Sequence, residues 1–65
     1  MREFILKTKQ DLKLFDIFVC GYFVSQVIGF AGNYVICEYI EADQDDCNVE
    51  LDYDAVDFFE ETETF

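Results

Sequence analysis

The stretch EYIEADQDDCNVELDYDAVDFFEETETF, residues 38–65, decides how the rest of this chain is interpreted. It carries twelve Asp and Glu residues and no Lys, Arg or His, whereas the 37 residues before it carry three acids and four bases. A disordered acidic tail is poor in aromatic and β-branched residues. This stretch instead contains Tyr39, Val49, Leu51, Tyr53, Val56, Phe58 and Phe59. We therefore expect it to be folded, with its acids on the outside.

Within the stretch, residues 47–53 alternate between apolar and polar side chains, which predicts a strand with one buried face. Residues 34–41 predict a second strand, and the polar residues 42–46 predict the turn between the two. We expect a hairpin centred near Gln44. Its apolar face pairs Val35 with Tyr53, Cys37 with Leu51 and Tyr39 with Val49, and its other face pairs Ile36 with Asp52, Glu38 with Glu50 and Ile40 with Asn48.

Two helices are expected on either side of this hairpin. Residues 9–20 place apolar side chains at helical spacing, with Thr8 as the N-cap and Gly21 where a helix commonly ends in a left-handed residue. A short last helix over residues 55–62 would be capped by Asp54.

The remaining segments predict strands. Residues 2–8 and 22–28 are apolar and rich in β-branched or aromatic side chains, and the glycines of residues 29–33 predict a turn. The sequence thus predicts a single α+β domain over residues 1–65, in the order β-α-β-β-β-α, with an antiparallel sheet.

The composition supports a small core. The chain has 65 residues, of which 52% are hydrophobic and 18% aromatic, so it can bury enough area without a staple. Its three cysteines, Cys20, Cys37 and Cys47, are an odd number and form no CxxC pair, and the chain has no His. This favours free thiols and argues against a zinc site. With no signal peptide evident, we expect a cytoplasmic, monomeric protein.

A membrane protein is the main structural alternative. Residues 17–37 hold no charge over 21 positions, which is long enough for one helical span. Bases precede this segment and acids follow it, as the positive-inside rule requires. Two features argue against a membrane span: the polar residues Ser25, Gln26 and Asn33, and the aromatic and β-branched composition, which suits strands.

No enzymatic motif is present. The chain lacks His, a nucleophile-elbow Ser and a Gly-rich phosphate loop, so we expect no catalytic activity and no cofactor. The acids near residue 45 offer oxygen ligands for Ca²⁺, but they do not form an EF-hand loop. Asn48 stands where that loop needs Gly, Cys47 takes a ligand position and Asp54 replaces the closing Glu. We therefore expect no dedicated metal site.

The arrangement of the acids suggests charge mimicry. The expected hairpin sets Glu38 against Glu50, and like charges opposite each other cost stability. On a strand, alternate residues lie about 6.6 Å apart, so Glu50, Asp52 and Asp54 would form a row of anions. Solubility needs a net charge of only about 2–8 in magnitude with mixed signs. Glu3 and Asp11 are expected to lie away from this acidic surface.

Small, acidic, aromatic-rich chains of this kind resemble phage-encoded DNA-mimic inhibitors, especially anti-CRISPR proteins. The resemblance lies in the composition of residues 38–63 and in the chain length. It implies a non-enzymatic inhibitor that contacts no nucleic acid itself and occupies the basic DNA-binding surface of a CRISPR effector subunit or a nuclease in a bacterial host. The expected partner-binding residues are Glu38, Glu41, Asp43, Asp45, Asp46, Glu50, Asp52, Asp54, Asp57, Glu60 and Glu61. A generic acidic adaptor for some basic protein is a further alternative.

Overall fold

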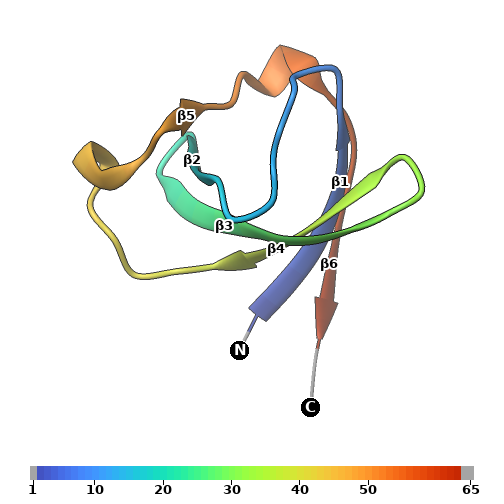
Figure 1. Cartoon of the computed structure of the whole chain (residues 1–65), viewed down its shortest axis with the longest axis horizontal. Coiled ribbons are helices and arrows are strands. Elements are labelled where there is room, and N and C mark those ends of the chain that lie inside the picture. The colour runs from blue at the N-terminus through green and yellow to red at the C-terminus, as the bar shows by residue number, and fades with distance from the viewer. Residues whose placement is uncertain (1, 64–65) are drawn as a thin grey trace.

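The computed structural model describes residues 2–63 of the chain, and its regular structure is almost entirely β-strand (Figure 1). The strands are β1 (Arg2–Thr8), β2 (Ile17–Cys20), β3 (Phe23–Ala31), β4 (Tyr34–Tyr39), β5 (Val49–Glu50) and β6 (Val56–Glu63). Two single 3-10 turns, η1 (Gln44–Asp46) and η2 (Tyr53–Ala55), lie before and after β5. The six strands form one sheet in the order β5-β2-β3-β4-β1-β6.

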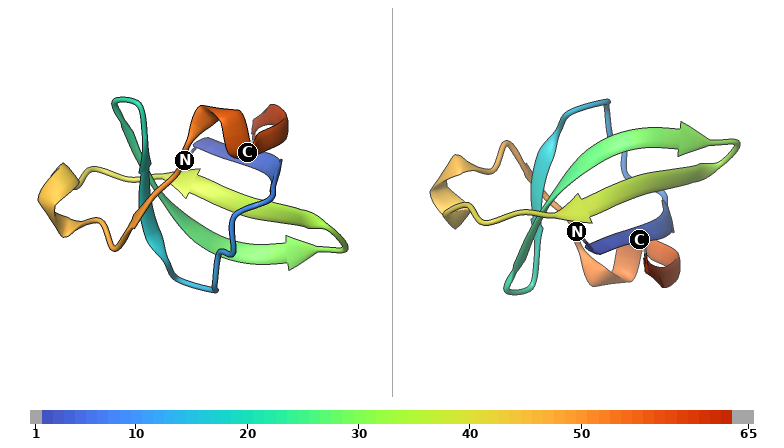
Figure 2. Two further views of the ribbon diagram at one scale, coloured as in Figure 1. Left: turned by 90° about the horizontal axis from the view of Figure 1, so that it is seen from above. Right: turned by 90° about the horizontal axis from the view of Figure 1, so that it is seen from below.

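Two tight hairpins form the middle of the sheet. Gly21 and Gly32 have φ values of 66° and 63°, and each opens the two-residue turn of a hairpin, β2–β3 and β3–β4. The left-handed conformation at this first turn position is the reason why glycine is needed there. The β3–β4 hairpin is the longest and its tip projects beyond the rest of the molecule (Figure 2).

The sheet must curl because its two edge strands are close in sequence. In a flat six-stranded sheet the edge strands would lie about 24 Å apart. Only five residues, 51–55, join β5 to β6, and part of that link is the compact turn η2. A link of this length cannot cross a flat sheet. The curled sheet encloses the core on its inner face, where Phe4, Leu6, Phe18, Val27, Cys37 and Leu51 are all buried.

Both predicted helices are wrong. Residues 9–16 form an irregular loop and residues 17–20 form β2, while residues 56–63 form β6. Thr8 does accept a hydrogen bond from the Gln10 amide, at 3.1 Å, but the chain turns instead of starting a helix. In both segments the β-branched and aromatic residues prefer the strand. Tertiary pairing with β3 and β1 overrides the helical spacing of the apolar residues.

The predicted hairpin between residues 34–41 and 47–53 is also wrong. Strand β4 pairs with β1 and β3, and Cys37 lies opposite Phe4 and Val27. Strand β5 crosses to the far edge, where it pairs with β2 in the parallel direction. The sheet is therefore mixed, not antiparallel, and the fold is not α+β. The predicted alternation of buried and exposed side chains is nevertheless correct around β5, since Leu51 is buried and Glu50 is exposed.

Other predictions agree with the structure. The strand predicted over residues 2–8 is β1, and residues 42–46 contain no strand. Cys20, Cys37 and Cys47 are free thiols, as expected.

The predicted helical span over residues 17–37 is not formed. The segment consists of β2, β3, part of β4 and the turns between them. Nowhere in residues 2–63 is there a helix with the length and apolar character needed to cross a bilayer.

Candidate functional site

Seven of the predicted partner-binding acids lie on one exposed segment of the chain. This segment leaves the end of β4, passes through η1 and β5, and reaches η2 at the rim of the curled sheet (Figure 1). We call it the acidic belt, and it consists of Glu41, Asp43, Asp45, Asp46, Glu50, Asp52 and Asp54, all of which are exposed. Between these acids, Val49 and Leu51 turn inward, and Leu51 joins the core.

Two amide side chains fix the backbone of the acidic belt to the rest of the fold. The Gln10 side chain donates to the Glu50 carbonyl at 3.0 Å and accepts from the Asp52 amide at 2.8 Å. The Asn48 side chain accepts from the Ile17 amide and donates to the Asp16 carboxylate, both at 2.8 Å. The belt thus has a defined course although most of it is not regular structure.

The belt carboxylates have no partners among the described residues. Only two ion pairs occur in that part of the chain, Arg2–Glu61 and Lys9–Asp57, and neither involves the belt. Asp43 and Asp52 even stand at the N-caps of η1 and η2 without accepting a capping hydrogen bond. In residues 2–63, no three acids or cysteines converge in a way that could hold a metal ion.

The remaining predicted acids lie elsewhere. Glu38 and Glu60 belong to the outer face of the sheet, where Glu38 lies opposite Glu3. The expectation that Glu3 lies away from the acidic surface is therefore wrong. The expected row of Glu50, Asp52 and Asp54 on one strand is not formed either, because β5 ends at Glu50.

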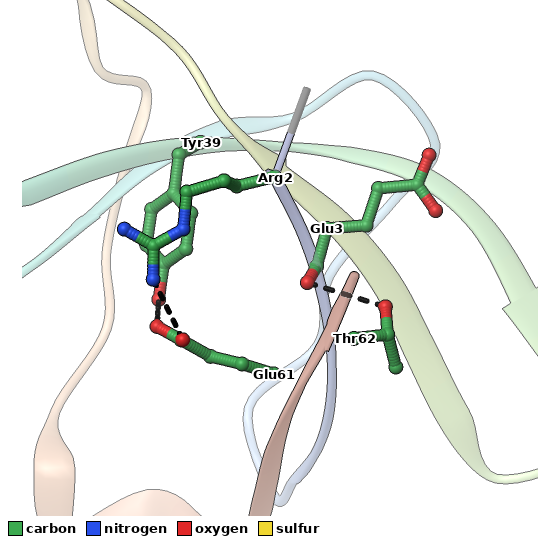
Figure 3. A network of polar contacts seen from close by, with 5 residues as sticks. All are labelled: Arg2, Glu3, Tyr39, Glu61 and Thr62. Atoms are coloured by element: carbon green, nitrogen blue, oxygen red, sulfur yellow. Dashed lines mark hydrogen bonds and ion pairs between the residues drawn. The ribbon is translucent and has the colours of Figure 1, made fainter. Parts of the chain in front are cut away.

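Asp57 and Glu61 are both engaged by bases. The Lys9 ammonium lies 3.9 Å from the Asp57 carboxylate. Glu61 accepts hydrogen bonds from the Arg2 guanidinium at 2.6 Å and from the Tyr39 hydroxyl at 3.0 Å (Figure 3). These two residues are therefore less available to a partner than the belt acids are.

The contacts around Glu61 form a compact polar cluster. The Arg2 guanidinium also lies over the Tyr39 ring, 5.3 Å from its centre. Hydrogen bonds from Tyr39 and Arg2 lower the pKa of Glu61, so this carboxylate stays ionised. Burial, together with the bond to Glu61, raises the pKa of Tyr39 to about 12. Figure 3 shows the Glu3 carboxylate directed away from this cluster.

An aromatic pocket opens on the inner face of the sheet, next to the polar cluster. Its volume is about 360 Å³, within the range of small-ligand sites. Its aromatic lining consists of Phe4, Phe18, Phe23, Tyr39, Tyr53 and Phe59. Phe18 and Phe4 lie at its base, whereas Phe23 and Tyr53 are more than 60% exposed at its mouth. Sequence reasoning missed this pocket, although twelve Phe and Tyr residues exceed what a thin core can cover.

Cys20 contributes a thiol to this pocket. Burial raises the pKa of this thiol, and the nearby Tyr53 hydroxyl only partly offsets the effect. Cys20 is therefore a poor nucleophile at neutral pH. Cys47 lies outside the pocket, next to η1, and Cys37 is buried in the core.

Comparison with protein-family models, curated proteins and solved structures finds no match to this chain.

Proposed function

We propose that this chain is an anti-CRISPR-like inhibitor that binds the basic DNA-binding surface of a host defence protein through the acidic belt. The observation that carries the proposal is the set of seven exposed carboxylates of the acidic belt. Within the described part of the chain, these carboxylates pair with no base, accept no capping hydrogen bond and form no cluster that could hold a metal ion. Acids that only maintained solubility would be mixed with bases.

The fixed backbone of the belt supports binding over simple solubility. Gln10 and Asn48 hold the segment in place before any partner arrives. A pre-ordered segment loses less conformational entropy on binding. The net charge of −11 would also steer the chain toward a basic surface and away from nucleic acid and anionic lipid. The partner's Lys and Arg side chains would meet the belt as they meet phosphates.

The first experiment measures inhibition directly. The chain is expressed in a bacterium whose CRISPR system restricts a test phage, and plating efficiency is compared with an empty vector and with a restriction–modification host. We expect plating to rise in one defence background. The proposal is wrong if none of the defences tested is weakened while the chain is shown to be folded and expressed.

The second experiment tests the belt. Asp52→Lys and Asp45→Lys each change the net charge by two units, and Glu60→Lys makes the same change on the outer face of the opposite edge strand. With the protein captured by the wild-type chain, we expect belt reversals to weaken binding and Glu60→Lys to leave it nearly intact. Duplex DNA should compete, and the affinity should fall with salt. Equal effects of all three reversals would show that only net charge matters. Binding without DNA competition would favour a generic acidic adaptor.

A further inference from the structure

The aromatic pocket is a second binding feature that the acidic belt does not explain. Three of its aromatic residues, Phe23, Tyr53 and Phe59, are between 50% and 67% exposed. Leaving large rings in water is unfavourable, and apolar surface of this kind marks interaction sites. Strands β3 and β6 and the turn η2 supply these three residues, so the pocket belongs to the scaffold and not to one loop.

The charges around the pocket restrict what it can bind. Among the described residues, Glu61, which is paired with Arg2, is the one charged group in the lining of the pocket, and no Lys, Arg or His lines it. The belt residues Asp52 and Asp54 are the chain neighbours of Tyr53 at the mouth. An anionic ligand such as a fatty acid would be repelled there, and so would a second copy of this chain with its charge of −11. The pocket therefore suits a cation on an apolar stem.

Arg2 demonstrates this chemistry within the chain itself. Its guanidinium lies over the Tyr39 ring and pairs with Glu61, and the three residues together line a second hollow. Tyr39 and Glu61 line both hollows. An arriving cation in the aromatic pocket would therefore meet the same ring, and it would share the Glu61 carboxylate with Arg2 and Tyr39, which each occupy one acceptor site on a different oxygen and leave further sites open. Arginine stacks on aromatic rings and buries its methylene stem against apolar surface.

We propose that the aromatic pocket receives one arginine side chain of the basic partner, with the stem among Phe4, Phe23 and Phe59 and the guanidinium near Tyr39 and Glu61. This inference rests on the proposed function, because a DNA-binding surface is the source of the arginine. The belt would supply long-range attraction, and the pocket would supply the anchor at which apolar area is buried.

The test uses Cys20 as a reporter in the intact protein. Alkylation of Cys20 and Cys47 by iodoacetamide is carried out at mildly alkaline pH, because both thiols have a raised pKa and only the thiolate reacts. It is followed by mass spectrometry with added N-acetyl-arginine methylamide, its uncharged citrulline analogue or N-acetyl-glutamate methylamide. We expect the arginine probe to slow the alkylation of Cys20 but not that of Cys47. The citrulline probe should bind about two- to fivefold more weakly, because it lacks the cation–π attraction, and the glutamate probe should not protect. Equal protection by arginine and citrulline, or no protection by arginine, would overturn the proposal.

Two adjacent residues on β6 provide a matched pair of variants. Phe59 faces the pocket, with its ring centre 5.1 Å from that of Phe4, whereas Phe58 contacts Tyr34 on the other face. Phe59→Ala should abolish the protection of Cys20 and Phe58→Ala should retain it. If Phe59→Ala does not fold, Tyr53→Ala replaces it, since Tyr53 is 67% exposed.

The same variants separate this inference from the proposed function. Against the captured partner, Phe59→Ala should weaken binding without changing its dependence on salt, whereas belt reversals should reduce that dependence. If belt reversals weaken binding to the partner but Phe59→Ala does not, the inference about the pocket is wrong and the proposed function of the belt is retained. Arginine protection of Cys20 without any effect of the belt reversals would refute the belt alone.

Discussion

Glu3 and Glu38 lie directly opposite each other on the antiparallel strands β1 and β4. Both side chains project from the outer face, because the adjacent residues in the two strands, Phe4 and Cys37, point into the core. Residues opposite each other in this way have Cβ atoms about 5 Å apart, and like charges at that separation are destabilising. The fold therefore contains a repulsion that a change of one residue can remove.

Reversing either member of this pair should stabilise the protein. Glu38→Lys and Glu3→Lys each convert a like-charge pair into an opposite-charge pair, with an expected gain of about 0.5–1 kcal/mol in the free energy of unfolding. The double variant restores a like-charge pair and should lose most of the gain of the singles. Urea denaturation at low salt measures all four proteins. Gains that simply add in the double variant would show that relief of the overall net charge is responsible, not this contact.

The sequence predicts the course of β1 and β4 well because their alternation and β-branched residues agree with the final structure. It fails for residues 9–20 and 55–62 because their spacing of apolar residues fits a helix and a strand about equally. Pairing decides between the two, and pairing is a long-range property. Phe18 fits the helical face proposed for it, yet its environment comes from Ser25 and Val49 on neighbouring strands.

The candidate site was predictable in composition but not in geometry. The exposed acids of residues 41–54 follow from their charge alone. The sequence does not reveal which acids are paired with bases. Arg2 reaches Glu61 and Lys9 reaches Asp57 only because β1 pairs with β6. The aromatic pocket depends on the same pairing, which places Phe59 beside Phe4.

Truncating the core should be severe in a chain of this size. Phe18 is 1% exposed and Leu51, although outside any strand, is 3% exposed. Phe18→Ala should cost about 3–5 kcal/mol and Leu51→Ala about 2–5 kcal/mol. A 65-residue domain has a total stability of only about 3–10 kcal/mol, so Phe18→Ala should be largely unfolded.

Chemical denaturation followed by circular dichroism measures these changes. Leu14→Ala is the matched control, because Leu14 is 48% exposed and its truncation should stay within about 0.5 kcal/mol. A Leu51→Ala variant as stable as Leu14→Ala would mean that residues 51–55 do not close the core as described.

Asp16 should make stability depend on pH. Its carboxylate accepts hydrogen bonds from the Lys13 amide and the Asn48 side chain, which lower its pKa. A lowered pKa in the folded state adds stability above the unfolded value of about 3.9, and this stability is lost as pH falls through the folded pKa. The stability advantage of the wild type over Asp16→Asn should therefore be constant near neutral pH and shrink in acid.

Urea denaturation of both proteins between about pH 7 and pH 3 measures this difference across the pKa range of aspartate. Asp11→Asn removes the same charge from a nearby exposed residue and controls for the general repulsion among the acids. A difference between wild type and Asp16→Asn that does not change with pH would contradict the role of these hydrogen bonds.

Phe15 is the one residue other than glycine with a left-handed backbone in residues 2–63, with φ at 70°. Its ring is 66% exposed, so packing does not explain its presence. The turn is held by its neighbours, since the Phe15 amide donates to the Val27 carbonyl at 2.9 Å and Gln26 donates to the Phe15 carbonyl at 3.2 Å. The strain should therefore persist in any variant that keeps a Cβ atom and lacks a side chain suited to this conformation.

Asparagine tolerates the left-handed region and alanine does not. Phe15→Asn should thus raise the free energy of unfolding by about 1 kcal/mol relative to Phe15→Ala, although both remove the same exposed ring. Thermal or urea denaturation of the pair measures the difference, and Phe15→Gly, which also relieves the strain, should gain less than Phe15→Asn because glycine adds entropy to the unfolded chain. If Phe15→Ala equals Phe15→Asn, the left-handed turn is not retained and the loop before β2 adopts another conformation.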